Sequence, residues 1–387
     1  MKDNQRKFPN GTLLSLSIVA IALFLVQIAS PAPIVFATSS TTSGCVSAGH
    51  TGLTAKLVVG SYSDVRGKSI NATGCDIGIY VAPWSTDVEI TGTVVWGANQ
   101  HGILVQDSSG VVIAHDLVKA NGVSSSVCPP SGAPPPGCIP EDKPIELVGT
   151  SYSVVANNLV IYNTADGGIG IADDGPQNPG APLGVSGANL TAHNILILGN
   201  RIVNNTRGCG IVIAAYNFGV RDVWAIGNTI IGQSPSTPIV APTGPYIGQI
   251  VVATDAPNTF MSGIHVLGNT LRGSYLPGIV VHANVFGDKI VNTEIKFNNL
   301  INNGYYPGPP NATSNTPNVV QGTTGISIVA ENPQPFAPAV ISNTLVAFNR
   351  VVGNTNGVWL CYTSHTTIVD LDTSASNPVA TCAGGGS

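Results

Sequence analysis

The chain has 387 residues, of which 43% are hydrophobic and only 9% are charged, and its formal net charge is −5. Ordinary soluble proteins carry roughly 25% charged residues, so Gly, Asn, Ser and Thr must form much of this surface. The 15 Lys and Arg residues are scattered singly among 20 Asp and Glu residues, which argues against a nucleic-acid partner. Such a surface suits contact with carbohydrate or protein.

The N-terminal segment has the pattern of a secretory signal. Three basic residues precede an apolar run from Thr12 to Ala29, and Val35 and Ala37 fit the −3 and −1 positions of a small-residue cleavage site. We therefore predict that residues 1–37 are removed as a signal peptide. The apolar run is also about long enough to span a bilayer, so an uncleaved membrane anchor is the alternative. In both cases we expect the rest of the chain to be secreted or displayed on the cell surface.

The cysteines agree with an extracellular location. Six of the seven pair plausibly by proximity in the sequence, although connectivity is not fixed by sequence alone. Cys209 is left over and is expected to be a buried small apolar residue. The predicted disulfides join Cys45 to Cys75, Cys128 to Cys138, and Cys361 to Cys382.

One pattern recurs along most of the chain. Each copy begins with a short strand in which the second and fourth residues are almost always Ile, Val or Leu, as in GILV at 102, GIVI at 210 and GISI at 325. A second apolar strand follows, and then a signature such as GNRI at 199 or GNTL at 268 that leads into a third strand. The repeat length of roughly 24 to 45 residues is typical of a chain that coils and stacks on itself.

The repeats predict a parallel β-helix with three sheets, about nine or more coils and an all-β composition. Stacking would bury the inward residues that one repeat cannot bury alone. We place an N-terminal cap in residues 38–74, the coil in 75–363 and a tail in 364–387. A β-sandwich is the competing fold, but it does not need the same Asn in every period. The expected ladder of stacked amides, with His115 in its first slot, contains Asn157, Asn200, Asn228, Asn269, Asn298 and Asn349.

The pattern GI-x-V, then I-x-x-N-x-I, then N-G resembles the right-handed parallel β-helix repeats of the pectin lyase-like superfamily. The resemblance covers most of the mature chain. It implies the fold, but it implies no single activity, because one fold carries many functions. The superfamily includes polysaccharide lyases, glycoside hydrolases, tailspikes, adhesins and surface proteins without known chemistry. Ligands of such helices usually lie on the outer face of the first sheet.

Carboxylates and aromatic residues concentrate on that face and just beyond the ends of its strands. If the protein is an enzyme, we expect four of the carboxylates to act in catalysis and the remaining residues to bind substrate. Strand spacing would put Glu146 near 5 Å from the Asp173/Asp174 pair, and Asp255 about 10 Å from that pair. The candidate catalytic residues are Asp173, Asp174, Glu146 and Asp255, and the candidate substrate-binding residues are Trp84, Asp107, Tyr216, His282, Glu331 and Trp359.

These residues leave several functions open. Asp173, Asp174 and Asn178 allow a calcium site, since hard cations favour clustered oxygen ligands. Asp and Asn after a strand are also ordinary turn formers. Hydrolysis is favoured over elimination, because no Lys or Arg falls on the outward stripe. We therefore expect a secreted β-helix that binds, and as an enzyme hydrolyses, a polysaccharide, and the alternative is a non-catalytic envelope or adhesion protein.

Overall fold

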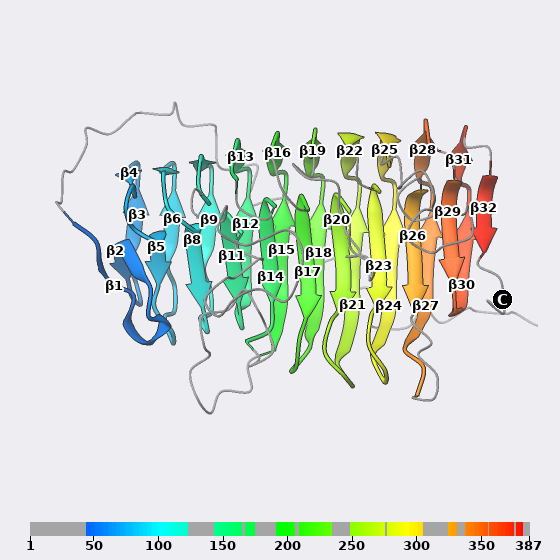
Figure 1. Ribbon diagram of the computed structural model, residues 1–387, viewed down its shortest axis with the longest axis horizontal. Helices are drawn as coiled ribbons and strands as arrows, with labels where there is room; N and C mark the ends of the chain where they lie inside the picture. Colours follow the sequence, from blue (N-terminus) through cyan, green and yellow to red (C-terminus); the bar gives the residue numbers. More distant parts are fainter. Residues whose placement is uncertain are drawn as a thin grey trace, which may run out of the picture. The chain divides into compact units, whose positions relative to one another are not determined.

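The computed structural model describes residues 44–122, 143–164, 167–174, 191–205, 209–233, 248–274, 277–304, 324–330, 337–354, 356–374 and 377–381, all within a compact unit that spans Thr38–Ser387. Short strands follow one another in a fixed rotation through three sheets, so each turn of the chain adds one strand to each sheet (Figure 1). The fold is a right-handed parallel β-helix. Within the described residues the only helix is the short 3-10 helix η1 (Gly49–Thr51).

The first sheet has 12 strands and the other two have 10 each. The first contains β1 (Val46–Ser47), β2 (Thr54–Val59), β5 (Ile77–Val81), β8 (His101–Gln106), β11 (Ile145–Val148), β14 (Ile169–Ala172), β17 (Ile211–Ala215), β20 (Ile250–Thr254), β23 (Ile279–Ala283), β26 (Thr324–Ala330), β29 (Asn356–Cys361) and β32 (Asn377–Thr381). The second contains β3 (Asp64–Arg66), β6 (Glu89–Thr91), β9 (Val112–Ala114), β12 (Ser151–Ala156), β15 (Ala192–Leu198), β18 (Val220–Ile226), β21 (Phe260–Leu267), β24 (Lys289–Lys296), β27 (Val340–Ala347) and β30 (Thr363–Val369). The third contains β4 (Ser69–Asn71), β7 (Val94–Trp96), β10 (Leu117–Lys119), β13 (Leu159–Ile161), β16 (Arg201–Val203), β19 (Thr229–Ile231), β22 (Thr270–Ser274), β25 (Asn299–Asn303), β28 (Arg350–Val352) and β31 (Asp372–Thr373).

The hydrophobic core runs inside the coil as continuous columns of identical or similar residues. In the first sheet Ile103, Ile145, Ile169, Ile211 and Ile250 pair in register from one coil to the next, and all are fully buried. The inward residues of all three sheets belong to one apolar cluster. The alternation of apolar residues in the sequence therefore encodes these columns directly.

The glycines at the start of the first-sheet strands allow close packing. A Cβ on Gly168 would lie 2.6 Å from Cγ2 of Ile202, and a Cβ on Gly210 would lie 2.6 Å from Cγ2 of Ile230. Neither glycine has a positive φ. Their role is to let the third-sheet isoleucines pack against the first sheet.

The Asn ladder is present, but its first two members differ from the prediction. Asn158 and Asp116, and not Asn157 and His115, stack with Asn200 and the later residues of the ladder. At Asn228 the backbone N–H donates to Oδ1 of Asn269 at 2.9 Å, and Nδ2 donates to the same oxygen at 3.0 Å and to the Ile197 carbonyl at 3.0 Å. The ladder therefore satisfies the polar groups that each bend buries inside the coil.

A shorter ladder of the same kind lies where the third sheet leads back to the first. The backbone N–H and Nδ2 of Asn121 donate to Oδ1 of Asn163, and those of Asn163 donate to Oδ1 of Asn205. All three side chains are fully buried. The Asn-Gly and Asn-Asn pairs at these bends did not lead us to predict this second ladder from the sequence.

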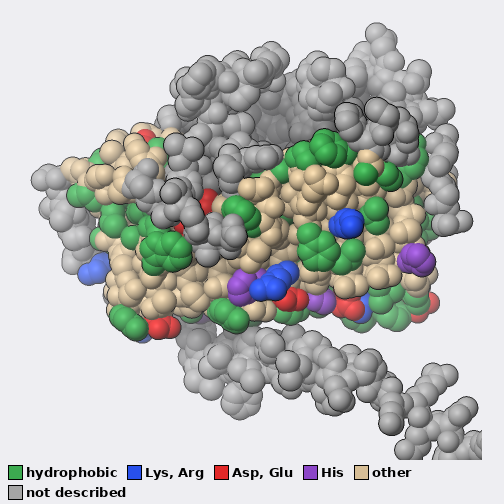
Figure 2. Space-filling view, turned by 90° about the horizontal axis from the view of Figure 1, so that it is seen from below, with side chains coloured by type: hydrophobic (Ala, Val, Ile, Leu, Met, Phe, Trp, Pro, Cys, Tyr) green, Lys and Arg blue, Asp and Glu red, His purple; other side chains and the backbone are tan. Residues whose placement is uncertain are grey.

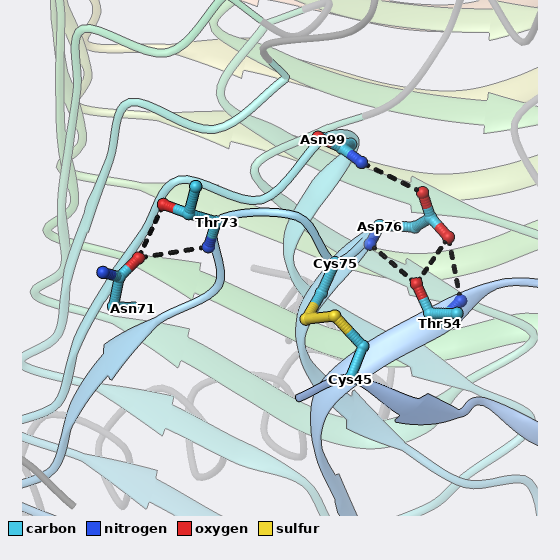
Figure 3. The surroundings of a disulfide bond; sticks show 7 residues. All are labelled: Cys45, Thr54, Asn71, Thr73, Cys75, Asp76 and Asn99. Carbon is cyan, nitrogen blue, oxygen red and sulfur yellow. Dashed lines mark hydrogen bonds between the residues drawn. A yellow bond between two sulfur atoms is a disulfide. The ribbon is translucent and has the colours of Figure 1, made fainter. Parts of the chain in front are cut away.

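The coil extends beyond both predicted limits. Its parallel strands begin with β2, inside the predicted cap, and continue to β32, inside the predicted tail. The cap consists of η1 and of β1, which pairs antiparallel with β2. Figure 3 shows the Cys45–Cys75 disulfide that ties this cap to the first coil, as predicted. Cys361 is also disulfide-bonded, whereas Cys128, Cys138 and Cys382 lie outside the described residues and their pairing stays a prediction.

Candidate functional site

The outward column of the first sheet has the predicted register, but its side chains are not exposed. Tyr80, Leu104, Glu146 and Gly170 lie opposite one another on successive coils, and Ser327 and Trp359 pair farther along the same column. All of these residues are buried. The open stripe expected from the sequence is therefore corrected to a buried, mainly apolar column with Glu146 within it.

Two carboxyl groups meet just beyond the ends of the first-sheet strands. Asp107 follows β8 and is 4% exposed, and Asp174 follows β14 and is 5% exposed. They interact with each other across the intervening coil. Nε2 of Gln106 donates to Oδ2 of Asp174 at 3.3 Å, and the Tyr80 hydroxyl donates to Oε1 of Gln106 at 3.0 Å.

This pair lacks the hydrogen bonds that normally accompany buried carboxylates. Among the described residues, neither oxygen of Asp107 and not Oδ1 of Asp174 has a hydrogen-bond partner of standard geometry. Burial raises the pKa of Asp107 to about 8, and the adjacent Asp174 adds to this through a side-chain hydrogen-bonding interaction and through its charge. Burial, followed by the charges of Asp107 and Asp174, also raises the pKa of Tyr80. These shifts favour the protonated form of the Asp107 carboxyl.

A second polar cluster lies at the opposite end of the same strands. His101 begins β8, and its Nδ1 lies 3.1 Å from both Oε2 of Glu146 and the Lys143 carbonyl. The backbone N–H of Lys143 donates to the same Glu146 oxygen at 3.4 Å. All three residues are buried.

Gly170 makes room for this cluster, since a Cβ there would lie 2.7 Å from Cγ of Lys143. Gly170 and Ala172, on β14, lie between the two polar clusters. The sequence reading missed the contributions of His101, Gln106 and Lys143. A polar residue at each end of an otherwise apolar first strand, as in HGILVQD, was the available signal.

The predicted approach of Glu146 to the Asp173/Asp174 pair is corrected by the register. Gly170 lies opposite Glu146, so Asp174 lies four residues farther along the strand direction, about 13 Å away by strand rise. The carboxyl that joins Asp174 is Asp107, which the sequence reading placed among substrate-binding residues. Sequence spacing could not show this contact because it crosses a complete coil.

Asp173 accepts hydrogen bonds from the backbone of the next coil. Its Oδ1 accepts the backbone N–H of Tyr216 at 2.7 Å, and its Oδ2 accepts those of Asn217 at 2.8 Å, Gly219 at 2.7 Å and Phe218. The carboxylate thus holds the turn of the next coil by four amides. We therefore do not propose Asp173 as a catalytic group, because its hydrogen bonds to this turn explain why a carboxylate follows β14.

Asp255 lies in a third polar group, two coils from Asp174. Asn284 donates its Nδ2 to Oδ1 of Asp255 at 2.9 Å. Burial raises the pKa of Asp255, while the Asn284 hydrogen bond and the charge of His282 lower it. Nearby, the Asp288 carboxylate accepts the backbone N–H groups of Thr259 and Val285, and burial raises its pKa to about 6.

The predicted aromatic platforms occupy different environments. Trp84 is 58% exposed and has a φ of 64°. Tyr216 and Trp359 are buried, so neither presents an open ring face to solvent. Glu331 and Asn178 lie outside the described residues, and the roles predicted for them stay predictions.

Two surveys of the described residues bear on metals and membranes. Across the described ranges, no three His, Cys, Asp or Glu side chains are grouped so that they could hold a metal ion. The calcium site with Asp173, Asp174 and Asn178 stays a prediction. In the same part of the chain, no helix is both long and apolar enough to cross a bilayer.

Comparisons with known proteins give distant likenesses only. No protein-family model and no curated relative matches the chain. Among solved structures, it is similar to the A-module of the mannuronan C-5 epimerase AlgE6 of Azotobacter vinelandii, with 13% identity and a TM-score of 0.39 over 83% of this chain and 80% of that one. It is also similar to PfbA, a surface adhesin of Streptococcus pneumoniae, with 10% identity and a TM-score of 0.40 over 86% and 84% of the two chains. The Agl-KA catalytic domain matches with 12% identity and a TM-score of 0.36, over 86% of this chain and 59% of that chain. These likenesses concern the fold alone.

Proposed function

We propose that the protein binds a polysaccharide along the outer face of the first sheet and hydrolyses it there, with Asp107 as general acid. The observation that carries this proposal is the buried carboxyl of Asp107, whose pKa is raised by burial and by the adjacent carboxyl of Asp174. Glycosidases use such an acid to protonate the leaving oxygen while another carboxylate acts on the opposite side of the sugar. The Gln106 and Tyr80 contacts fix the position of the pair.

Glu146 is the base in this proposal. It lies three residues from the position opposite Asp107, or about 10 Å by strand rise, close to the roughly 6.5–9.5 Å of inverting enzymes. Water attacks the anomeric carbon, its proton passes to Glu146, and the Asp107 proton passes to the departing oxygen. His101 orients Glu146 through their 3.1 Å contact. Because both carboxyls are almost fully buried, the surrounding surface must move when substrate binds.

The test is a digestion screen of the purified protein against neutral and acidic polysaccharides, read as new reducing ends. We expect Asp107→Asn to lower the rate at least 100-fold, since a positioned general acid contributes about 10²–10⁴-fold. Asp370→Asn is the matched control, because Asp370 is exposed and its φ of 45° is close to the 47° of Asp107. Equal loss in both variants, or full activity in Asp107→Asn, would overturn the assignment.

One observation favours elimination as a second candidate reaction. The sequence analysis found no lysine on the outward stripe, but the buried Lys143 donates its backbone N–H to Glu146, and its Cγ would lie 2.7 Å from a Cβ on Gly170 of that face. Lysine amines act as bases in proton abstraction. Unsaturated uronates among the products, lost in Lys143→Gln, would establish elimination. Glycan binding without any product would support the non-catalytic recognition protein.

A further inference from the structure

The outer face of the third sheet is unusually apolar for a surface. Its outward residues alternate with the core residues along each short strand, and most of them are partly exposed. We call these residues the third-sheet face. Its apolar members are Val94, Trp96, Leu117, Leu159, Ile161, Val203, Ile231, Ile301 and Val352, which pair in register from coil to coil.

The charges on this face are mostly positive. Its cations are Lys119, Arg201, Arg272 and Arg350. The only acidic residue on the described strands of the sheet is Asp372, on the last of them, and it forms an ion pair with Arg350. The chain as a whole has more acidic than basic residues. By contrast, the view from below in Figure 2, away from the third sheet, shows acidic, basic and histidine side chains close together in one band. The third-sheet face is therefore a basic, apolar strip on an acidic protein.

Exposed aromatic residues stand at both margins of this face. Phe297 and Phe348 form a stacked pair with centroids 5.2 Å apart, and they are 60% and 48% exposed. Both have positive φ angles, of 58° and 55°, at a bend where preceding coils have Gly199, Gly227 and Gly268. A bulky residue is strained in this conformation, so the bend itself does not require the rings. Tyr162, at the other margin, is 60% exposed and also has a positive φ.

The shape and chemistry of the strip select among partners. Two copies of this face would bring like charges together, which disfavours self-association. A glycan needs many hydrogen-bonding groups, but one outward column consists mainly of aliphatic side chains. Eight successive strands from β7 to β28 give a straight strip about 34 Å long at strand spacing. Basic residues with Trp, Tyr and Phe at the margins are the chemistry of proteins that lie on anionic membranes.

We propose that the third-sheet face docks on an anionic lipid surface, with Phe297 and Phe348 entering the headgroup region. This contact is independent of whether the N-terminal segment remains as an anchor, and of the site on the first sheet. The cations attract the lipid headgroups, and the apolar columns lose water on contact. The straight strip places the axis of the coil parallel to the membrane.

The test is co-sedimentation of the purified protein, with and without residues 1–37, with vesicles of phosphatidylcholine alone or with phosphatidylglycerol. We expect binding only to the anionic vesicles, weakened at least tenfold by high salt. Phe297→Asn with Phe348→Asn should weaken it at least tenfold, and so should Arg201→Gln with Arg272→Gln. Asn suits the positive φ, so these aromatic variants should fold.

Tyr152→Asn is the matched control, because Tyr152 is an exposed aromatic residue of positive φ on the second sheet. It should leave binding unchanged. Equal binding to neutral vesicles, no binding, or loss of binding only in the control would overturn the proposal. Dimerisation abolished by the Phe variants would show that a second copy occupies the face. Capture of an acidic polysaccharide by the Arg residues would show that a glycan does.

Discussion

Two sets of buried polar side chains in this molecule differ in how well they are satisfied. Asn228 and its neighbours in the ladder donate and accept hydrogen bonds in every coil. Asp107 is just as well buried, but within the described structure both of its oxygens lack a partner of standard geometry. A satisfied buried network supports a unique fold, whereas an unsatisfied group is retained at a cost. The difference separates residues that hold the coil from residues available for chemistry.

Removing one rung of the ladder should have the largest effect. Asn228→Ala leaves donors of Asn200 without their acceptor inside the coil, and each buried unsatisfied group costs about 1–3 kcal/mol. We expect the free energy of unfolding to fall by about 4 kcal/mol in chemical denaturation. Asn157→Gly is the control, because Asn157 lies beside the ladder at a φ of 55°. A similar loss in the control would mean that the bend, and not the ladder, is responsible.

Asp173 tests whether a buried carboxylate can serve to hold the coil. Asp173→Ala removes the acceptor for four backbone amides of one turn. We expect a loss of about 3 kcal/mol in the free energy of unfolding, with the reaction of any remaining folded protein unchanged. A full loss of turnover without a loss of stability would instead return Asp173 to the catalytic group.

The pH dependence of stability should show the cost of the unsatisfied pair. The pKa of Asp107 is about 8 in the folded protein and ordinarily 3.8, so the folded state keeps a proton that the unfolded state has lost between these values. Its contribution to stability is therefore present at low pH and is lost as pH rises through 8. Asp288, with a pKa of about 6, acts in the same direction at lower pH.

The interval between pH 6 and 8 isolates Asp107 from Asp288. We expect the free energy of unfolding to fall by about 2 kcal/mol over this interval, since one pKa unit corresponds to about 1.4 kcal/mol. Denaturation of Asp107→Asn at both pH values should show this fall abolished. If the fall persists unchanged, Asp107 does not hold the proton.

The sequence predicted the coil well because each coil must supply the same inward apolar residues in order to pack against its neighbours. The ladder was misplaced by one residue at its first two positions, in AHDL at 114 and in ANNL at 156. The residue that directly precedes the third strand is the one that stacks, and this rule selects Asn158 and Asp116. Alignment on that strand would have found both.

The candidate site was harder to predict because it depends on contacts across coils. Asp107 and Asp174 were each noticed, but their interaction crosses a complete coil and does not follow from sequence spacing. Lys143 precedes β11, and its backbone N–H donates to Glu146, a contact that the sequence pattern did not indicate. Burial of the outward column could not be foreseen, since alternation along a strand does not say what covers its outer face.

The ladder also bears on how such a chain can evolve. Asn200 and Asn228 are 28 residues apart, and Asn298 and Asn349 are 51 apart, yet the N–H to Oδ1 distances are 2.9 and 3.0 Å. The hydrogen-bond geometry of the ladder is thus the same whatever the number of residues between two stacked asparagines. Insertions can lengthen the connections without disturbing the scaffold, so selection can vary the loops and the framework separately.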